Sequence, residues 1–250
     1  MKIATWNVNG IRAREAQMLE WVQRERPDVI CLQEIKARPD QVPASLASLA
    51  DYWCYWHGAG GYSGVGLHFR KDRFPDEPAF SHPDFDHETR IVQAVVGDLV
   101  LASVYVPNGG KDYQAKITFL TAMEHYVTSV HATGRQLVVC GDLNVARTDR
   151  DVHPKERQAN IIGQRPEERA LLEGICARGV VDVGRALDPD NDALFTWWPP
   201  WRSMKARNIG WRLDYVLASA PLAERAESCQ VRREFGTSDH GPVIATFRDA

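Results

Sequence analysis

The stretch Leu137-Val138-Val139-Cys140-Gly141-Asp142-Leu143-Asn144 decides the fold class of this chain. Its apolar run predicts a buried strand, and the polar residues after it are expected at the strand's carboxyl end. Asp142 and Asn144 stand two positions apart, so in extended backbone both side chains would face the same side. Gly141 allows a turn or a close approach to a ligand. Because Gly, Asp and Asn also form ordinary turns, the stretch alone does not identify a site.

The bulk composition is that of a globular protein, and residues 1–250 are interpreted as a single domain. A net charge of −3 excludes a generally basic nucleic-acid binder, but it leaves room for a local basic patch. Five cysteines without framework or zinc spacing favour reduced thiols and a cytoplasmic chain. No signal peptide and no apolar run long enough for a bilayer are recognisable, so we expect no membrane association.

The hydrophobic pattern predicts more strands than helices. Strands are expected over residues 2–6, 29–32, 64–69, 91–96, 99–106, 180–183, 212–217 and 243–247. Helices are expected over residues 11–26, 42–49, 113–130 and 166–177, and surface loops over 74–88 and 147–165. Local hairpins and helical crossovers both occur, which predicts an α/β sandwich of mixed sheets with the helices outside.

Polar side chains recur where the expected strands end. They are Asn7, Glu34, Tyr105, Asn108, Asp142, Asn144, Asp214, Asp239 and His240. An unpaired buried carboxylate costs several kcal/mol, so gathered acids imply a cation, protons or solvent. Carboxylate and amide oxygens without cysteine suit a hard ion such as Mg²⁺, or Mn²⁺ in its place, better than zinc.

Each of these residues also has an ordinary structural explanation. Asn7 and Asn144 fit turn amides that bond their own backbone. Glu34 fits a first-turn helix acid, and Tyr105 fits plain sheet packing. Asp214 fits a structural ion pair, and Asp239 with His240 fits a capping pair. Only the joint occurrence favours a catalytic site.

Six short motifs, in order along the chain, carry a family resemblance. They are Trp6-Asn7-Val8-Asn9-Gly10, Leu32-Gln33-Glu34, Tyr105-Val106-Pro107-Asn108, Gly141-Asp142-Leu143-Asn144, Trp211-Arg212-Leu213-Asp214-Tyr215 and Ser238-Asp239-His240. The set resembles the exonuclease III family of apurinic/apyrimidinic (AP) endonucleases, within the endonuclease/exonuclease/phosphatase superfamily. The resemblance implies a four-layer α/β sandwich, with two mixed β-sheets face to face and helices on the outside. It also implies one catalytic domain over residues 1–250.

The resemblance implies a metal site and a catalytic set. Glu34 would be the main metal carboxylate, with Asn7 beside it and Asp239 reaching the metal directly or through water. Several family members carry Asp at the position of Asn9, where an amide is a poorer cation ligand. Asp142 would orient and deprotonate the attacking water. The phosphate oxygens would be held by Tyr105, Asn108 and Asn144. His240 would contact the phosphate as an imidazolium, oriented by Asp214.

The stretch from Trp197 to Leu213 interleaves tryptophans with basic residues, which suits a phosphate backbone and an unstacked sugar or base. A core aromatic cluster below a solvated basic edge is the alternative. By resemblance, Trp197, Trp211 and Leu213 would line a pocket for a flipped-out abasic deoxyribose. Contacts with the flanking DNA are expected from Tyr62, Lys111, Asn160 and Trp201.

The function that the resemblance implies is a Mg²⁺-dependent AP endonuclease, a phosphodiester hydrolase that cuts double-stranded DNA 5′ to abasic sites as a monomer. Additional 3′-phosphodiesterase or 3′→5′ exonuclease activity is left open. One alternative is a related-fold phosphodiesterase acting on intact DNA or another phosphate ester. A non-catalytic scaffold is the third hypothesis, and the presence of all the catalytic residue types weighs against it.

Overall fold

Two six-stranded mixed sheets form the centre of the protein. The computed structural model describes residues 1–249. The first sheet consists, in spatial order, of β11 (Ala226–Val231), β12 (Val243–Phe247), β1 (Lys2–Asn7), β2 (Val29–Gln33), β4 (Val65–Arg70) and β3 (Tyr52–His57). The second consists of β5 (Ala79–Ser81), β6 (Ile91–Val96), β7 (Leu99–Tyr105), β8 (Gln136–Asp142), β10 (Asp214–Ser219) and β9 (Val180–Asp182).

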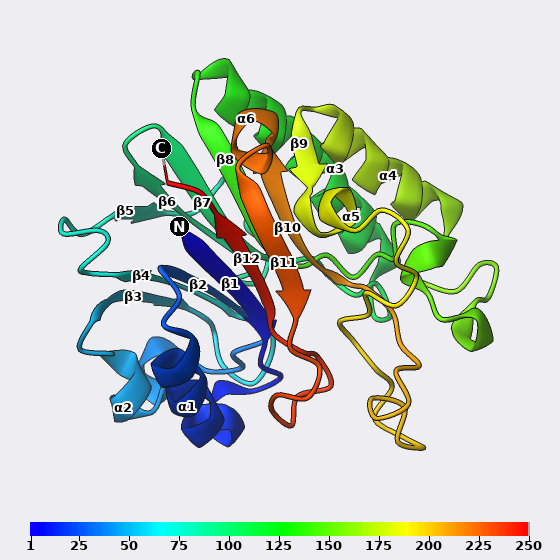
Figure 1. Ribbon diagram of the computed structural model, residues 1–250, viewed down its shortest axis with the longest axis horizontal. Helices are drawn as coiled ribbons and strands as arrows, with labels where there is room; N and C mark the ends of the chain where they lie inside the picture. Colours follow the sequence, from blue (N-terminus) through cyan, green and yellow to red (C-terminus); the bar gives the residue numbers. More distant parts are fainter. Residues whose placement is uncertain (250) are drawn as a thin grey trace.

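Helices cover the outer face of each sheet (Figure 1). The first sheet is covered by α1 (Glu15–Glu25) and α2 (Ala44–Ala47), and the second by α3 (Tyr113–Ala132) and α4 (Pro166–Ala177). Two short helices, α5 (Val183–Leu187) and α6 (Ala220–Ala223), lie beside β9, β10 and β11. The four-layer α/β sandwich expected from the sequence is therefore confirmed.

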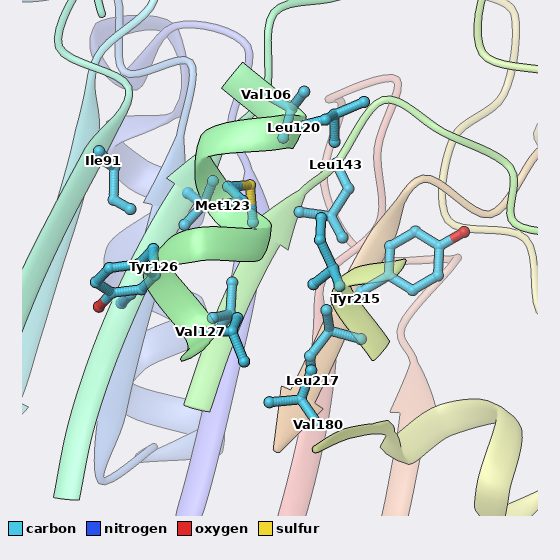
Figure 2. Packing of buried hydrophobic residues seen from close by; sticks show 14 of the residues in the cluster. Ile91, Val106, Leu120, Met123, Tyr126, Val127, Leu143, Val180, Tyr215 and Leu217 are labelled. Carbon is cyan, nitrogen blue, oxygen red and sulfur yellow. The ribbon is translucent and has the colours of Figure 1, made fainter. Parts of the chain in front are cut away.

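The strand β8 shows why the central run is apolar without alternation. Val138 and Cys140 face the other sheet, whereas Leu137 and Val139 pack below α3. Figure 2 shows the outer of these two layers, which contains Met123 and Val127 of α3 and Leu217 of β10. A strand buried on both faces needs apolar residues at every position.

The two-residue period of the strands places the polar residues at the same mouth between the sheets. Ile3, Val138 and Val216 belong to the layer between the sheets. The corresponding terminal positions on the same faces are Asn7 on β1, Asp142 on β8 and Asp214 on β10. Asp142 lies opposite Tyr105 on parallel β7 and opposite Asp214 on antiparallel β10. Register and alternation thus bring distant residues to one end of the sandwich.

Packing between β7 and β8, rather than a turn or a ligand, requires glycine at position 141. Its φ is +150°, and a Cβ there would lie 1.9 Å from the carbonyl oxygen of Val104 on β7. Asn144 also differs from the expectation, because its φ of 52° takes it out of extended backbone. Asp142 and Asn144 therefore do not share a strand face.

Several element boundaries differ from the sequence expectation. The helix expected over 42–49 is only Ala44–Ala47, since the chain turns at Leu49 to enter β3. The expected loop 74–88 contains the short strand β5, and the expected loop 147–165 buries Asp151 and Val152. The strand expected over 212–217 is Asp214–Ser219, and β11 lies in the polar connection after it. The hairpin over 91–106 and the helices at 113–130 and 166–177 are confirmed.

Two further expectations concern the whole chain. All five cysteines are free thiols in the structure. Among residues 1–249, no helix combines the length and the apolar character needed to cross a bilayer.

Candidate active site

Glu34 lies at the centre of a hydrogen-bonded group formed by three strands. It follows β2 directly and adopts a φ of 50°, which turns its side chain into the mouth between the sheets. The Tyr105 hydroxyl donates to Glu34 Oε1 at 2.7 Å, and Asn7 Nδ2 donates to the same oxygen at 3.1 Å. Three residues predicted for the site thus meet at one carboxylate.

Asn7 also holds the second acid of the site. Its Nδ2 donates to Asp142 Oδ2 at 2.9 Å, while its own Oδ1 accepts the backbone N–H of Asn9. Asn7 therefore lies beside Glu34 as expected, but it presents N–H groups rather than an oxygen to the two carboxylates. A cation would need the amide oxygen in that place, so the role of Asn7 as a metal ligand stays a prediction.

His240 and Asp214 form a buried pair beside Asp142. His240 Nδ1 lies 2.8 Å from Asp214 Oδ2, and His240 Nε2 lies 3.7 Å from Asp142 Oδ2. The Asp214 backbone is held by Thr196 Oγ1, which accepts its N–H and that of Leu213. Asp214 Oδ1 is buried without a hydrogen-bond partner among residues 1–249. That oxygen can accept one more donor or a cation.

Burial and neighbouring charges move the pKa values of Asp142 and His240 in ways that suit hydrolysis. Burial, with Asp214 and Glu34 nearby, raises the pKa of Asp142 to about 7. Burial alone would lower the pKa of His240, but the Asp214 and Asp142 carboxylates raise it to about 10. A base that is half ionised near neutrality therefore stands beside an imidazolium.

The sequence reasoning missed Lys36, which contacts the second oxygen of the Glu34 carboxylate. Lys36 Nζ lies 2.8 Å from Glu34 Oε2 and donates to Asn9 Oδ1 at 2.6 Å. Burial would raise the pKa of Glu34, but the bonds from Lys36 and Tyr105 keep it below its ordinary value. The position of Lys36, two residues after a predicted metal carboxylate, was the available signal.

Asn9 connects Lys36 to Asp239. Its Nδ2 donates to Asp239 Oδ1 at 2.8 Å, and Trp197 Nε1 donates to Asp239 Oδ2 at 3.0 Å. Burial would raise the pKa of Asp239, but His240 and the two donors lower it. The amide at Asn9 thus serves as a bridge that an Asp at this position cannot make, since a carboxylate donates no hydrogen.

The charges of the site fit a divalent cation. Glu34, Asp142, Asp214 and Asp239 are four carboxylates, and among the described residues the cationic nitrogens within 4.0 Å of them belong to Lys36 and His240. With all four ionised, two negative charges remain without a partner. Asp142, Asp214 and His240 offer ligand atoms within 4.8 Å of one another. The donors are oxygens, apart from one imidazole already bonded to Asp214, which suits a hard ion.

The predicted sugar pocket is an apolar rim beside these acids. Trp211 and Leu213 are buried together with Ala146 and Val152, and Trp197 packs against them partly exposed. The Trp197 and Trp211 rings meet edge to face with centroids 5.4 Å apart. Because Trp197 also bonds Asp239, the rim is tied directly to the charged group.

Tyr62, Asn108 and Lys111 come together on the β6–β7 side of the site. They line a surface hollow of about 170 Å³. Tyr62 is 47% exposed, and its hydroxyl accepts a hydrogen bond from buried Arg90. Arg90 lies between the Tyr62 and Tyr105 rings, with its guanidinium carbon 5.1 and 4.7 Å from their centroids. The hollow is thus linked to Tyr105.

The remaining predicted DNA contacts lie on exposed loops on the β8–β10 side. Trp201 is 56% exposed, and Asn160 is also exposed, with a φ of 69°. The structure leaves both outside the hydrogen-bonded catalytic group. A hollow of about 600 Å³ beside β11 contains none of the predicted site residues.

Asn144 is anchored from behind by a buried lysine that the sequence reasoning also missed. Asn144 Nδ2 donates to the carbonyl of Val106, and its backbone N–H donates to Asp142 Oδ1. Lys116 Nζ donates to the Asn144 carbonyl at 2.7 Å and pairs with fully buried Glu168. Helix α3 thereby fixes the loop after β8.

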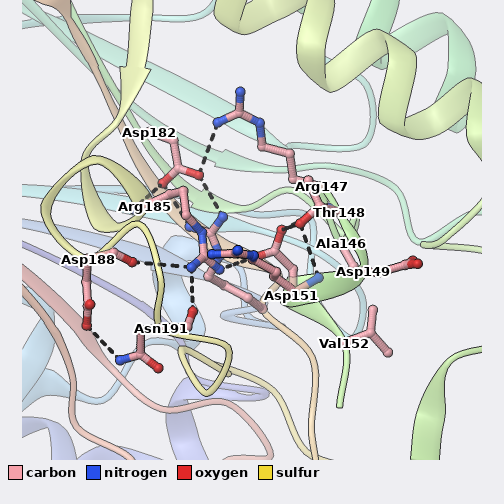
Figure 3. Close-up of polar contacts among 12 residues, drawn as sticks. Ala146, Arg147, Thr148, Asp149, Asp151, Val152, Asp182, Arg185, Asp188 and Asn191 are labelled. Atoms are coloured by element: carbon pink, nitrogen blue, oxygen red, sulfur yellow. Dashed lines mark hydrogen bonds and ion pairs between the residues drawn. The ribbon is translucent and has the colours of Figure 1, made fainter. Parts of the chain in front are cut away.

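A second buried network holds the segment just before Asp214. Arg212 bonds Asp151 Oδ1 at 2.7 Å and both oxygens of Asp182 at 2.8 and 2.7 Å. Figure 3 shows that Asp182 also contacts Arg147 and that Asp151 also contacts Arg185. Buried charges are stable only when they are paired. The network therefore fixes the position in which the chain enters β10.

Comparison with known proteins agrees with this geometry. A family model described as the Endonuclease/Exonuclease/phosphatase family matches residues 4–240. The chain is 34% identical to the DNA repair nuclease APEX1 of Danio rerio, over 97% of this chain and 81% of that protein. It is 30% identical to an exodeoxyribonuclease of Bacillus subtilis, over 97% and 98%. Recombination repair protein 1 of Drosophila melanogaster is 32% identical, and the chain spans 37% of its length.

Solved structures show the same architecture. A 3′ phosphatase, NExo, from Neisseria bound to a product DNA hairpin has a TM-score of 0.89 and 29% identity, with 99% of both chains covered. An AP endonuclease from Archaeoglobus fulgidus has a TM-score of 0.86 and 30% identity, with the same coverage. The resemblance stated from the six motifs is confirmed.

Proposed function

The chain belongs to the Endonuclease/Exonuclease/phosphatase family as a DNA repair nuclease, and we propose that it hydrolyses the phosphodiester 5′ to abasic sites in duplex DNA. The observation that carries the proposal is the meeting of Asp142, Asp214 and His240, with ligand atoms within 4.8 Å, beside the Glu34 group. This set combines a base, an oriented imidazolium and acids for a cation.

In the proposed reaction, Asp142 in its ionised form accepts the proton of the attacking water. Its raised pKa makes it a better base near neutral pH than an ordinary aspartate. His240, held by Asp214, directs positive charge and an N–H toward the phosphate, where negative charge grows in the transition state. The bond from phosphorus to the 3′ oxygen breaks. That oxygen takes a proton from solvent to become the 3′-hydroxyl, and the phosphate stays on the 5′ carbon of the abasic sugar.

Other residues position the phosphate. Tyr105 keeps its proton, because burial and the Glu34 and Asp142 charges raise its pKa. Its hydroxyl can therefore donate to a phosphate oxygen when it exchanges its bond with Glu34. Asn144 is placed beside Asp142 by its backbone bond, and Asn108 lies at the adjoining hollow. Phosphate binding by these three residues is part of the proposal.

We propose Mg²⁺, with Mn²⁺ as a substitute, as the ion of this site. Glu34 would be its main ligand and Asp239 would contribute directly or through water, whereas Asn7 would hold the carboxylates in place. When bound, such an ion supplies Lewis acidity and charge neutralisation at the phosphate. The excess of two negative charges in the site supports this assignment.

The surfaces on either side of the acids support a duplex substrate. The Tyr62–Lys111 hollow lies on the β6–β7 side, and exposed Trp201 lies on the β8–β10 side. An abasic nucleotide forfeits little stacking when it leaves the helix. The apolar rim of Trp197, Trp211 and Leu213 suits its sugar. We further propose a monomer in the cytoplasm, and the five free thiols support a reducing compartment.

A second candidate function is removal of a blocking group at a DNA 3′ end. The 3′ phosphatase from Neisseria matches over 99% of both chains, which favours it. Both reactions attack a phosphate next to a 3′ oxygen with the same groups. They differ in whether DNA continues past the site.

The test is a panel of duplexes carrying a tetrahydrofuran abasic analogue, a 3′-phosphate at a nick, a recessed 3′ end or an internal uracil. We expect Mg²⁺-dependent incision 5′ to the tetrahydrofuran as the fastest reaction, abolished by EDTA. Faster release of the 3′-phosphate would support the second candidate. Equal turnover on intact and abasic duplex would reject abasic-site specificity.

A further inference from the structure

A second group of metal-binding side chains lies at the edge of the sandwich, away from the catalytic acids. His57 ends β3, His82 follows β5, and Asp86 lies in the loop before β6. Strands β3 and β5 are the edge strands of the two sheets. Each residue offers one ligand atom, and these atoms lie within 4.8 Å of one another.

His82 is oriented by a contact that is typical of a metal ligand. His82 Nδ1 lies 3.1 Å from the Ile91 carbonyl oxygen, which can only accept a hydrogen. The neutral ring therefore keeps its lone pair on Nε2, which faces the Tyr55 hydroxyl at 2.9 Å. A backbone carbonyl on the far ring nitrogen is the usual support of a metal-bound histidine.

Asp86 is also held by backbone groups, and these come from the start of β6, where the Ile91 carbonyl contacts His82. Its Oδ1 accepts the backbone N–H groups of Arg90 and Ile91 at 2.8 and 3.0 Å. Its Oδ2 remains for His57 Nε2, at 2.6 Å. The His57 and His82 rings stack with centroids 3.8 Å apart, and the His57 and Asp86 side chains are 20% and 15% exposed. The group is preformed and reachable from solvent.

We propose that His57, His82 and Asp86 form a second metal site, for a borderline divalent ion such as Zn²⁺, that joins the edges of the two sheets. Two imidazoles and one carboxylate are a ligand set that Zn²⁺ prefers and Mg²⁺ does not. A fourth position is open to water or to the Tyr55 hydroxyl. Tyr55 of β3 and Phe80 of β5 already stack with centroids 4.9 Å apart, so the ion would reinforce an existing contact.

The site is separate from the catalytic group. His57 is in register with Val65, Val65 with Gln33, and Gln33 with Asn7. Three strand spacings, about 14 Å, therefore divide His57 from Asn7, and two, about 10 Å, divide it from Gln33, the residue before Glu34. Zinc at this edge leaves the Glu34 and Asp239 carboxylates available for another ion.

The test uses the full chain, freed of metal by a chelator and then saturated with Mg²⁺ to fill the catalytic position. Zn²⁺ is titrated by calorimetry, and Co²⁺ serves as a spectroscopic probe of coordination number. The variants are His57→Gln and His82→Gln. His125→Gln, at an exposed histidine on α3, is the matched control.

We expect one Zn²⁺ per native chain, a Zn²⁺-induced rise in Tm, and visible Co²⁺ bands of a four-coordinate site. Each cluster variant should weaken Zn²⁺ binding at least tenfold, and His125→Gln should not. If His82→Gln fails to fold, as judged by circular dichroism, His57→Gln decides alone. Zn²⁺ binding that survives both cluster variants, or that is lost only in Glu34→Gln, would overturn the proposal.

Discussion

His240 is held by Asp214, with 2.8 Å between His240 Nδ1 and Asp214 Oδ2, and both side chains are buried. The contact keeps the imidazole charged in a place where burial alone would discharge it. The reactive state of the histidine thus depends on its neighbour's carboxylate.

Asp214→Asn should move the alkaline limit of activity to lower pH. The variant removes the carboxylate that raises the pKa of His240, so the imidazolium is lost sooner as pH rises. We expect a fall in kcat of about 10²–10⁴-fold at pH 8, measured by incision of an abasic duplex. Asp98→Asn, in the exposed turn between β6 and β7, is the control and should act like the native chain.

The native pH–rate profile should be bell-shaped. Asp142 must be ionised to accept a proton, so the rate rises as pH passes about 7. His240 must be protonated, so the rate falls as pH approaches about 10. Single-turnover rates between pH 5.5 and 10.5 at saturating Mg²⁺ measure both limits. A flat profile across this range would contradict the two assignments.

Asn9→Asp should increase the affinity of the site for Mg²⁺. It replaces the amide that donates to Asp239 with a carboxylate, so the metal-free variant gains repulsion and loses roughly 1 kcal/mol of stability. A divalent ion relieves that repulsion, and the Mg²⁺-induced rise in Tm should exceed that of the native chain.

Asn191→Asp is the matched control for this variant. Asn191 Nδ2 also donates to an aspartate, Asp188, but in an exposed loop. Its Mg²⁺-induced shift in Tm should equal the native one. A smaller Mg²⁺ response in Asn9→Asp than in the native chain would show that Asn9 does not face the ion.

Gly141→Ala should destabilise the fold strongly. The new Cβ would lie 1.9 Å from the Val104 carbonyl oxygen, so β7 and β8 would have to separate. We expect a loss of at least about 3 kcal/mol in the free energy of unfolding, measured in urea. Gly110→Ala is the control, since its nearest contact is the Asn108 side chain at 3.5 Å, and it should change stability by less than about 1 kcal/mol.

Much of the site was predictable because each strand carries its own signal. Apolar runs predicted β2 and β8, and a polar residue at the end of each run marked Glu34 and Asp142. Strand alternation sends Asp142 to the mouth between the sheets, whereas Glu34 reaches the same mouth because of its positive φ. By contrast, β11 has no clear alternation and owes its place to pairing with β12, which no local pattern reveals.

The contacts between loops were harder to predict. Lys36 and Asn9 approach each other only after β1 and β2 have paired, and residues 27 apart in sequence give no local signal of such a bond. Lys116 looked like an ordinary helix lysine, yet tertiary packing buries it against Glu168. The orientation of the Asn7 amide depends on hydrogen bonds with Glu34, Asp142 and Asn9, which its residue type alone does not predict.

The most direct measurement is single-turnover incision of a tetrahydrofuran duplex by the Asp142→Asn variant with Mg²⁺, alongside its affinity for the same DNA. Asparagine keeps the shape of the side chain but cannot accept a proton from water. We expect the incision rate to fall by about 10²–10⁴-fold while the Kd for abasic DNA stays within about threefold of the native value. A near-native incision rate in this variant would contradict the assignment of Asp142 as the base.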